Sequence, residues 1–311
     1  MMMTLLTSAP LLPLILLSRF YACSGLVVPI SAANPSASLT GLSLPLVGKN
    51  GDTLDVGVAL STTTASRTMV VLGTHAGDFN TIEYCQRLRH FLPELSDRGG
   101  VSRFLLVVNG EETSCELLSR LLDLPEAIEI LSDPTGEAGR RFGASRGWRP
   151  DDVELNAFFK LFVVGIGLGP PWGTLPAVLA GYVGDPNGRR EWIEAALRQG
   201  QLAGRSAGPL PDILNLDAAN GDAVIGNRFD DFPLVGGWGR RPLELATLRL
   251  QNIIGIQFEH WNTLKPIDDR CLTQLGGCAI VGCDGEPIYS WVDQGLCDVP
   301  DFDEILEALD K

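Results

Sequence analysis

The sequence predicts an α/β fold around a parallel central sheet. Three short apolar segments rich in β-branched residues have the character of strands covered on both faces, and they are expected at residues 69–72, 104–109 and 128–131. The first two are each followed by a segment with helical periodicity. The order strand, helix, strand, helix, strand implies right-handed crossovers and parallel pairing.

The first helix follows a short loop after residue 72, and its apolar residues recur every three or four positions. These residues are Ile82, Cys85, Leu88, Phe91 and Leu95. Asn80 and Glu83 have the spacing of a capping box, which predicts that the Asn80 side chain accepts a hydrogen bond from a backbone amide near Glu83. Further helices are expected at residues 111–124 and 135–142, the second ended by Gly143.

The ends of the chain add a predicted edge strand, a hairpin and a helix. Residues 53–60 are expected to form the edge strand, and residues 278–292 a hairpin that turns at Asp284 and Gly285. Residues 301–309 have the pattern of a helix. The apolar face of that helix comprises Phe302, Ile305, Leu306 and Leu309.

Residues 146–270 are too many for one loop in a compact domain, so this segment must carry elements of its own. Helices are expected at residues 189–201 and at 243–261, where Pro242 suits a first helical position. The Gly-, Asp-, Asn- and Pro-rich stretch 205–239 is expected to be looped.

The stretch Gly77-Asp-Phe-Asn-Thr-Ile-Glu-Tyr resembles the active-site segment of the AhpC/TSA-type peroxiredoxin-like proteins of the thioredoxin superfamily. The resemblance continues over residues 103–143 and resumes at 241–250 and 272–289, where it is similar to the plastid and cyanobacterial branch. It implies a thioredoxin-like (peroxiredoxin-like) central sheet in residues 51–311, with a long helical and loop insertion at 146–270. It also implies an antioxidant thiol peroxidase or oxidoreductase.

Two residue types at this segment argue against thiol chemistry. Family members that keep their cysteines have Cys-x-x-Cys after the glycine, and here Asp78 and Thr81 occupy those positions. Thiol–disulfide exchange requires sulfur. The family's antioxidant activity therefore competes with a non-redox binding or assembly module on the same scaffold, and whether the chain is an enzyme stays open.

Four residues are candidates for a site at this segment: Cys85, Asp78, Thr81 and His75. Cys85 lies on the apolar helix face, where burial would raise the pKa of its thiol and reduce its reactivity. A carboxylate such as that of Asp78 is a common helix cap. His75 could act as a general base toward a nucleophile, but a solvated loop position is its simpler interpretation.

The sequence predicts neither a metal nor a cofactor. Of seven cysteines, Cys23 lies in a leader-like segment and none forms Cys-x-x-Cys; free thiols are expected, with pairing among Cys278, Cys283 and Cys297 left open. The glycines from Gly165 to Gly169 suggest a nucleotide-dependent oxidoreductase only remotely. The last glycine of a dinucleotide fingerprint would fall at Pro170, which does not suit the helix that the motif needs.

The 38 acidic and 24 basic residues give a net charge of −14, which argues against nucleic-acid binding. Residues 1–24 resemble a secretory signal, and residues 26–46 have the composition of a transit peptide. Together they predict a leader over residues 1–50 and import into a plastid, with secretion as the alternative. No permanent transmembrane anchor is expected. A plastid protein partner and the oligomeric state are left open.

Overall fold

The computed structural model describes residues 34–61, 66–165, 167, 174, 189, 191–205, 214–227 and 242–311. The signal-like segment and the first part of the transit-like segment lie outside these residues. The described residues belong to one compact unit. Within the described residues, no helix combines the length and the apolar character that crossing a bilayer requires.

A mixed five-stranded sheet forms the centre of the fold, in the order β5-β4-β3-β8-β9. The first three of these strands in the chain are parallel, namely β3 (Arg67–Leu72), β4 (Val101–Val108) and β5 (Ile128–Ser132). The hairpin of β8 (Gly277–Val281) and β9 (Pro287–Val292) continues the sheet antiparallel to β3. The predicted α/β class, the three parallel strands and the C-terminal hairpin are therefore confirmed.

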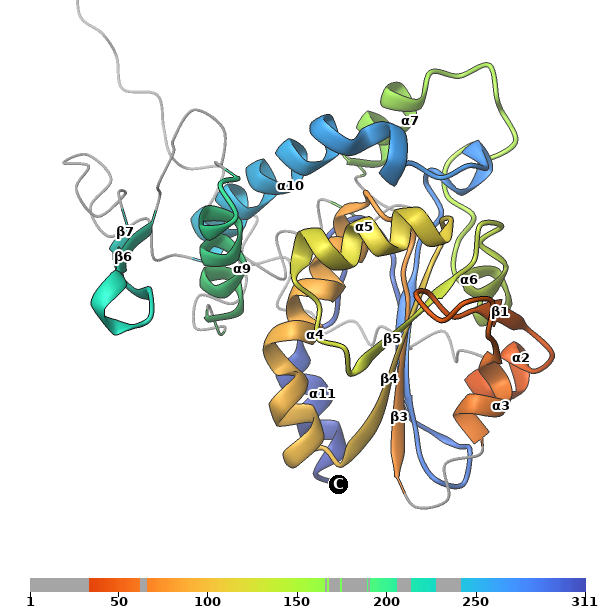
Figure 1. Ribbon diagram of the computed structural model, residues 1–311. Helices are drawn as coiled ribbons and strands as arrows, with labels where there is room; N and C mark the ends of the chain where they lie inside the picture. Colours follow the sequence, from red (N-terminus) through yellow and green to blue (C-terminus); the bar gives the residue numbers. More distant parts are fainter. Residues whose placement is uncertain are drawn as a thin grey trace, which may run out of the picture. The chain divides into compact units, whose positions relative to one another are not determined.

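Helices cover both faces of the sheet. Helix α4 (Phe79–Asp97) and helix α11 (Phe302–Leu309) lie on one face (Figure 1). The other face carries α2 (Pro35–Leu39), α3 (Val56–Ser61) and α6 (Glu137–Phe142). Two clusters of buried apolar side chains form the core, and alternate residues of β3 contribute to each. Met69 and Val71 belong to the first cluster, and Val70 and Leu72 belong to the second. The apolar face predicted for α4 is buried throughout.

The folded region begins upstream of the predicted domain start at residue 51. Helix α2 (Pro35–Leu39) and β1 (Ser43–Pro45) fall within the stretch that was expected to be leader, yet Leu39, Leu42 and Leu44 are buried in the second core cluster. The predicted edge strand at 53–60 is wrong beyond its first three residues. Strand β2 (Thr53–Asp55) pairs with β1 alone, and α3 (Val56–Ser61) follows it.

Short helices follow β4 and β5, as predicted. Helix α5 (Glu112–Leu122) is followed by the C-cap residue Asp123, which has the left-handed conformation. Helix α6 (Glu137–Phe142) ends at Gly143, whose φ of 103° suits a residue without a Cβ atom.

The described part of the long insertion includes three α-helices. They are α7 (Ala157–Gly165), α9 (Glu191–Leu202) and α10 (Pro242–Leu264). Helices α9 and α10 match the two predicted ones. The looped interpretation of residues 205–239 is wrong in part, because β6 (Leu214–Asp217) and β7 (Ala223–Asn227) form a small antiparallel hairpin. Helix α9 packs on α4, and α10 contacts α4, α5 and α9.

Candidate functional site

The loop that joins β3 to α4 is buried. Every residue from Gly73 to Asp78 has less than a tenth of its surface exposed, and His75 and Thr74 have none. The Asp78 carboxylate caps α4 by accepting a hydrogen bond from the Asn80 backbone amide at 3.0 Å. Asp78 is thus a helix cap, as its position suggested, whereas the capping box predicted for Asn80 and Glu83 is wrong because the helix begins earlier.

Thr81 lies in the first turn of α4 and is fully buried. Its hydroxyl oxygen accepts a hydrogen bond from the Thr74 backbone amide at 2.8 Å and lies 3.0 Å from the Thr74 hydroxyl. These contacts tie the loop to the helix that follows it. The Thr81 side chain is therefore engaged in holding the loop.

Helix α10 of the insertion covers this loop. The Leu264 carbonyl oxygen accepts a hydrogen bond from the Gly77 amide at 3.1 Å, and Gln257 donates its side-chain amide to the Gly77 carbonyl. The indole ring of Trp261 meets the His75 imidazole edge to face, with the ring centroids 6.0 Å apart. The insertion thus lies directly on the segment that carries the family resemblance.

His75 is fully buried, so its interpretation as a solvated loop residue is wrong. Its Nδ1 lies 3.3 Å from the Leu264 carbonyl oxygen, which can only accept, so Nδ1 carries the proton. Burial lowers the pKa of the imidazole, although the nearby Asp78 carboxylate opposes this shift. The Nε2 atom is buried without a hydrogen-bond partner in the described structure. A neutral imidazole tolerates this, whereas protonation would place an unpaired donor there.

Cys85 is buried and faces the apolar core, as predicted. Burial raises the pKa of its thiol well above the usual range, with the neighbouring Cys115 contributing in the same direction. The Cys85 sulfur is therefore protonated at neutral pH and has no solvent access. Such a thiol is a poor nucleophile.

The other cysteines within the described residues are free thiols as well. Cys115, Cys271 and Cys278 are buried, Cys297 is half-buried, and Cys283 is exposed in the hairpin turn. The pairing left open for the hairpin cysteines is therefore not present.

A buried polar network lies beside the loop, and the sequence did not predict it. Asp293 follows β9, and its carboxylate accepts hydrogen bonds from the Tyr84 hydroxyl at 2.7 Å and the Asn80 side-chain amide at 2.8 Å. Asn80 also donates to the Gly295 carbonyl and accepts from the Cys297 amide. Burial raises the pKa of Asp293, and the two donated bonds oppose that shift. No local pattern signals this network, because its partners lie more than 200 positions apart.

The glycine run at residues 165–169 does not follow a strand. Gly165 is the last residue of helix α7, so Phe162 and the two valines after it are helical. A dinucleotide fingerprint needs a strand before its glycines and a helix after them. Residues 168–173, which include Pro170, lie outside the described residues. Among the described side chains no group of three His, Cys, Asp or Glu residues is placed to hold a metal ion.

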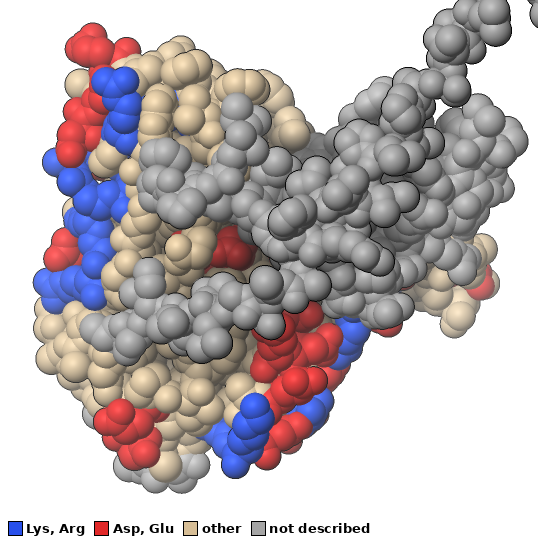
Figure 2. Space-filling view, turned by 180° about the vertical axis from the view of Figure 1, so that it is seen from behind, with Lys and Arg blue, Asp and Glu red and all other residues tan. Residues whose placement is uncertain are grey.

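Several surface charges of the described residues pair with charges of opposite sign. Figure 2 shows acidic and basic side chains side by side along the margins of the face opposite to that of Figure 1. Arg189, for example, donates to Glu94 at 2.7 Å and to Asp303 at 3.0 Å, and Arg98 pairs with Asp310. These basic side chains face carboxylates, an arrangement that does not favour a nucleic-acid backbone.

Comparisons of the chain with protein-family models, with curated proteins and with solved structures found no significant match.

Proposed function

We propose that this protein is a peroxiredoxin-like member of the thioredoxin superfamily that acts as a non-redox binding or assembly module. The observation that carries the proposal is the burial of loop 73–78 beneath α10, together with Asp78 and Thr81 at the positions of the family's cysteines. A thiol peroxidase needs a thiolate that both a peroxide and a reductant can reach. This loop offers neither sulfur nor access.

The connectivity of the sheet supports the thioredoxin-like part of the proposal. Strand β3 is central, its C-terminal end leads into the loop and α4, and the parallel strands are followed by the β8–β9 hairpin and α11. This is the order that the resemblance implied. Val70, Leu106 and Ile280, from three separate segments, lie in one sheet.

The plastid location belongs to the same proposal and depends on the leader-like composition and on the branch of the family that the sequence resembles. The partner of such a module would be another plastid protein.

A peroxide assay tests the proposal. Full-length protein is given hydrogen peroxide, thioredoxin, thioredoxin reductase and NADPH, and NADPH consumption is followed. We expect no turnover above the rate without the protein, before or after alkylation of the accessible thiols. The double variant Asp78→Cys/Thr81→Cys serves as the comparison, because it returns two sulfurs to a helix start that favours a thiolate.

The double variant is expected to form a disulfide that a small phosphine reduces faster than thioredoxin does, since α10 covers the loop. Peroxide turnover by the unmodified protein would contradict the proposal and favour the family's antioxidant activity. Cys283→Ser would then show whether the exposed hairpin thiol, rather than a thiol near the loop, carries the reaction.

A further inference from the structure

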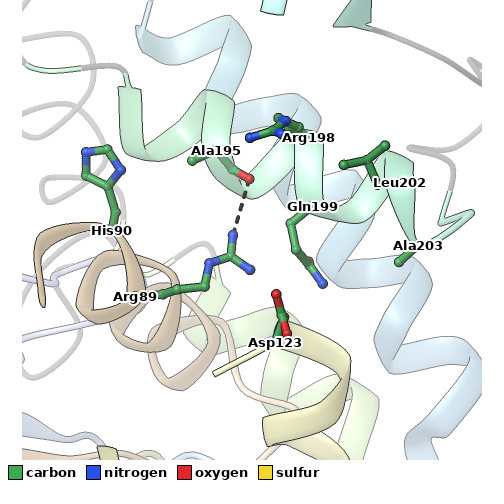
Figure 3. Close-up of a pocket in the computed structure, with 8 residues that line it drawn as sticks. All are labelled: Arg89, His90, Asp123, Ala195, Arg198, Gln199, Leu202 and Ala203. Atoms are coloured by element: carbon green, nitrogen blue, oxygen red, sulfur yellow. Dashed lines mark hydrogen bonds between the residues drawn. The ribbon is translucent and has the colours of Figure 1, made fainter. Parts of the chain in front are cut away.

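A cavity of about 590 Å³ lies between α4, the end of α5 and α9 (Figure 3). We call it the arginine pocket, and its main lining side chains are Arg89, His90, Asp123, Arg198, Gln199 and Leu202. Its volume falls within the range of small-molecule sites, about 300–1,000 Å³. The pocket is separate from the loop covered by α10, although α4 contributes to both.

Arginines outnumber carboxylates among the side chains that line the arginine pocket. Arg89 and Arg198 line it, and Arg205, outside the lining, donates a hydrogen bond at 2.8 Å to the Gln199 side chain. Among the described lining residues, Asp123 has the one carboxylate side chain. Burial lowers the pKa of Arg89; the Asp123 carboxylate opposes this shift, and the charges of Arg205 and Arg198 add to it. The guanidinium groups therefore repel one another, and a bound anion would relieve this repulsion.

The two lining arginines are held in place by neutral carbonyl groups. Arg89 donates to the Leu122 carbonyl at 2.6 Å and to the Ala195 carbonyl at 3.2 Å, and Figure 3 shows its guanidinium between α4 and α9. Arg198 donates to the Gly221 carbonyl at 2.6 Å. A guanidinium has five N–H donors, so each of the two arginines has N–H groups beyond those used in these hydrogen bonds. Within the described structure neither forms an ion pair, and the Arg198 Nε is buried without a partner.

We propose that the arginine pocket binds a small organic phosphate monoester. Guanidinium groups match the geometry and the charge of phosphate oxygens better than an ammonium group does. The cavity is much larger than one inorganic anion. Leu202, with 54% of its surface exposed, and Ala203 offer an apolar wall for the organic part of the ester.

Calorimetric titration of the full-length protein tests this proposal with three probes: inorganic phosphate, phenyl phosphate and phenol. We expect phenyl phosphate to bind at least about tenfold more tightly than inorganic phosphate, because the ring adds apolar contact. Phenol alone is expected not to bind measurably. Leu202→Ala should weaken the binding of phenyl phosphate and leave that of inorganic phosphate unchanged.

The arginine contribution is tested by Arg198→Gln, which removes one charge from the lining. Phenyl phosphate should bind about tenfold or more weakly to this variant, given the strength of hydrogen bonds to charged groups. Arg120→Gln is the matched control, because it makes the same change on the exposed surface of α5 and should alter affinity less than about twofold. Arg198→Lys, which keeps the charge, should retain part of the affinity.

Equal affinity for inorganic phosphate and phenyl phosphate would contradict the proposal of a monoester site and would indicate a site for free phosphate instead. If neither inorganic phosphate nor phenyl phosphate binds, the pocket is not an anion site. The same conclusion follows if Arg198→Gln and Arg120→Gln lose the same affinity for phenyl phosphate. If Arg198→Gln does not fold, the comparison of Arg198→Lys and Leu202→Ala with the unmodified protein still decides between these outcomes.

Discussion

Helix α4 carries two polar regions that differ in access to solvent. At its first turn Asp78, Asn80 and Thr81 are buried, and each has a partner inside the protein. Further along, Arg89 faces an open cavity and is held only by carbonyl oxygens within the described structure. The start of α4, the segment that resembles the active-site segment of the peroxiredoxin-like proteins, is therefore closed by packing, while the accessible polar groups lie elsewhere on the same helix.

The largest expected effect comes from removing the cover of the loop. Leu264→Ala truncates a fully buried side chain whose Cβ lies against Gly77, and it should lower the free energy of unfolding by about 3 kcal/mol. Leu202→Ala makes the same change at the arginine pocket and should cost less than about 0.5 kcal/mol. Urea denaturation of the two variants measures this difference. Similar losses in both would show that the two regions of α4 do not differ in packing as described.

A smaller effect is expected from the hydroxyl that ties the loop to α4. Thr81→Val keeps the shape of the side chain but leaves the Thr74 amide without its acceptor, at a cost of about 1–3 kcal/mol. Thr113→Val, at an exposed position of α5, is the matched control and should stay within about 0.5 kcal/mol of the unmodified protein. A Thr81→Val variant as stable as its control would mean that the hydroxyl does not hold the loop.

The smallest effect is a pH dependence at the covered loop. The pKa of His75 is lowered in the folded state, so below its ordinary value of about 6.5 the unfolded chain binds a proton that the folded protein does not. Stability contributed by neutral His75 is present above that pH and is lost as the pH falls. The slope for one such group is at most about 1.4 kcal/mol per pH unit.

His75→Asn tests this dependence, because its amide nitrogen can replace Nδ1 as donor to the Leu264 carbonyl. Unfolding free energies measured from pH 5 to pH 7.5 should rise less steeply with pH for the variant than for the unmodified protein. Equal slopes would show that His75 does not contribute to the pH dependence of the unfolding free energy.

Local periodicity was sufficient to predict most of the fold. The strands around Val70 and Leu106, the apolar face that includes Cys85, and the α11 face that includes Phe302 all follow from spacing, because burial on a helix or strand repeats with the period of the backbone. The role of Asp78 as a cap was also accessible, since it depends on a residue only two positions away.

The parts that could not be predicted depend on contacts between distant segments. His75 looked solvated because its cover, at Trp261 and Leu264, comes from an insertion almost 190 positions later. Asn80 has the local pattern of a cap but bonds to Asp293 instead. The residues next to His75 and Asn80 in the sequence do not indicate either of these contacts. The site at the start of α4 is a product of tertiary packing, whereas the helix itself is a product of local pattern.

The early start of the folded region limits where the predicted leader could be cleaved. Ser36 donates a hydrogen bond to the carbonyl of Gly285 in the hairpin turn, and Leu39 and Leu44 fill the core behind the sheet. A processing peptidase that cut as far as residue 50 would remove these side chains and uncover the apolar surface of β3 and β8 beneath them. Such a product would be a target for quality control. If the predicted leader is removed, a cut is therefore compatible with this fold only where it lies before Asn34.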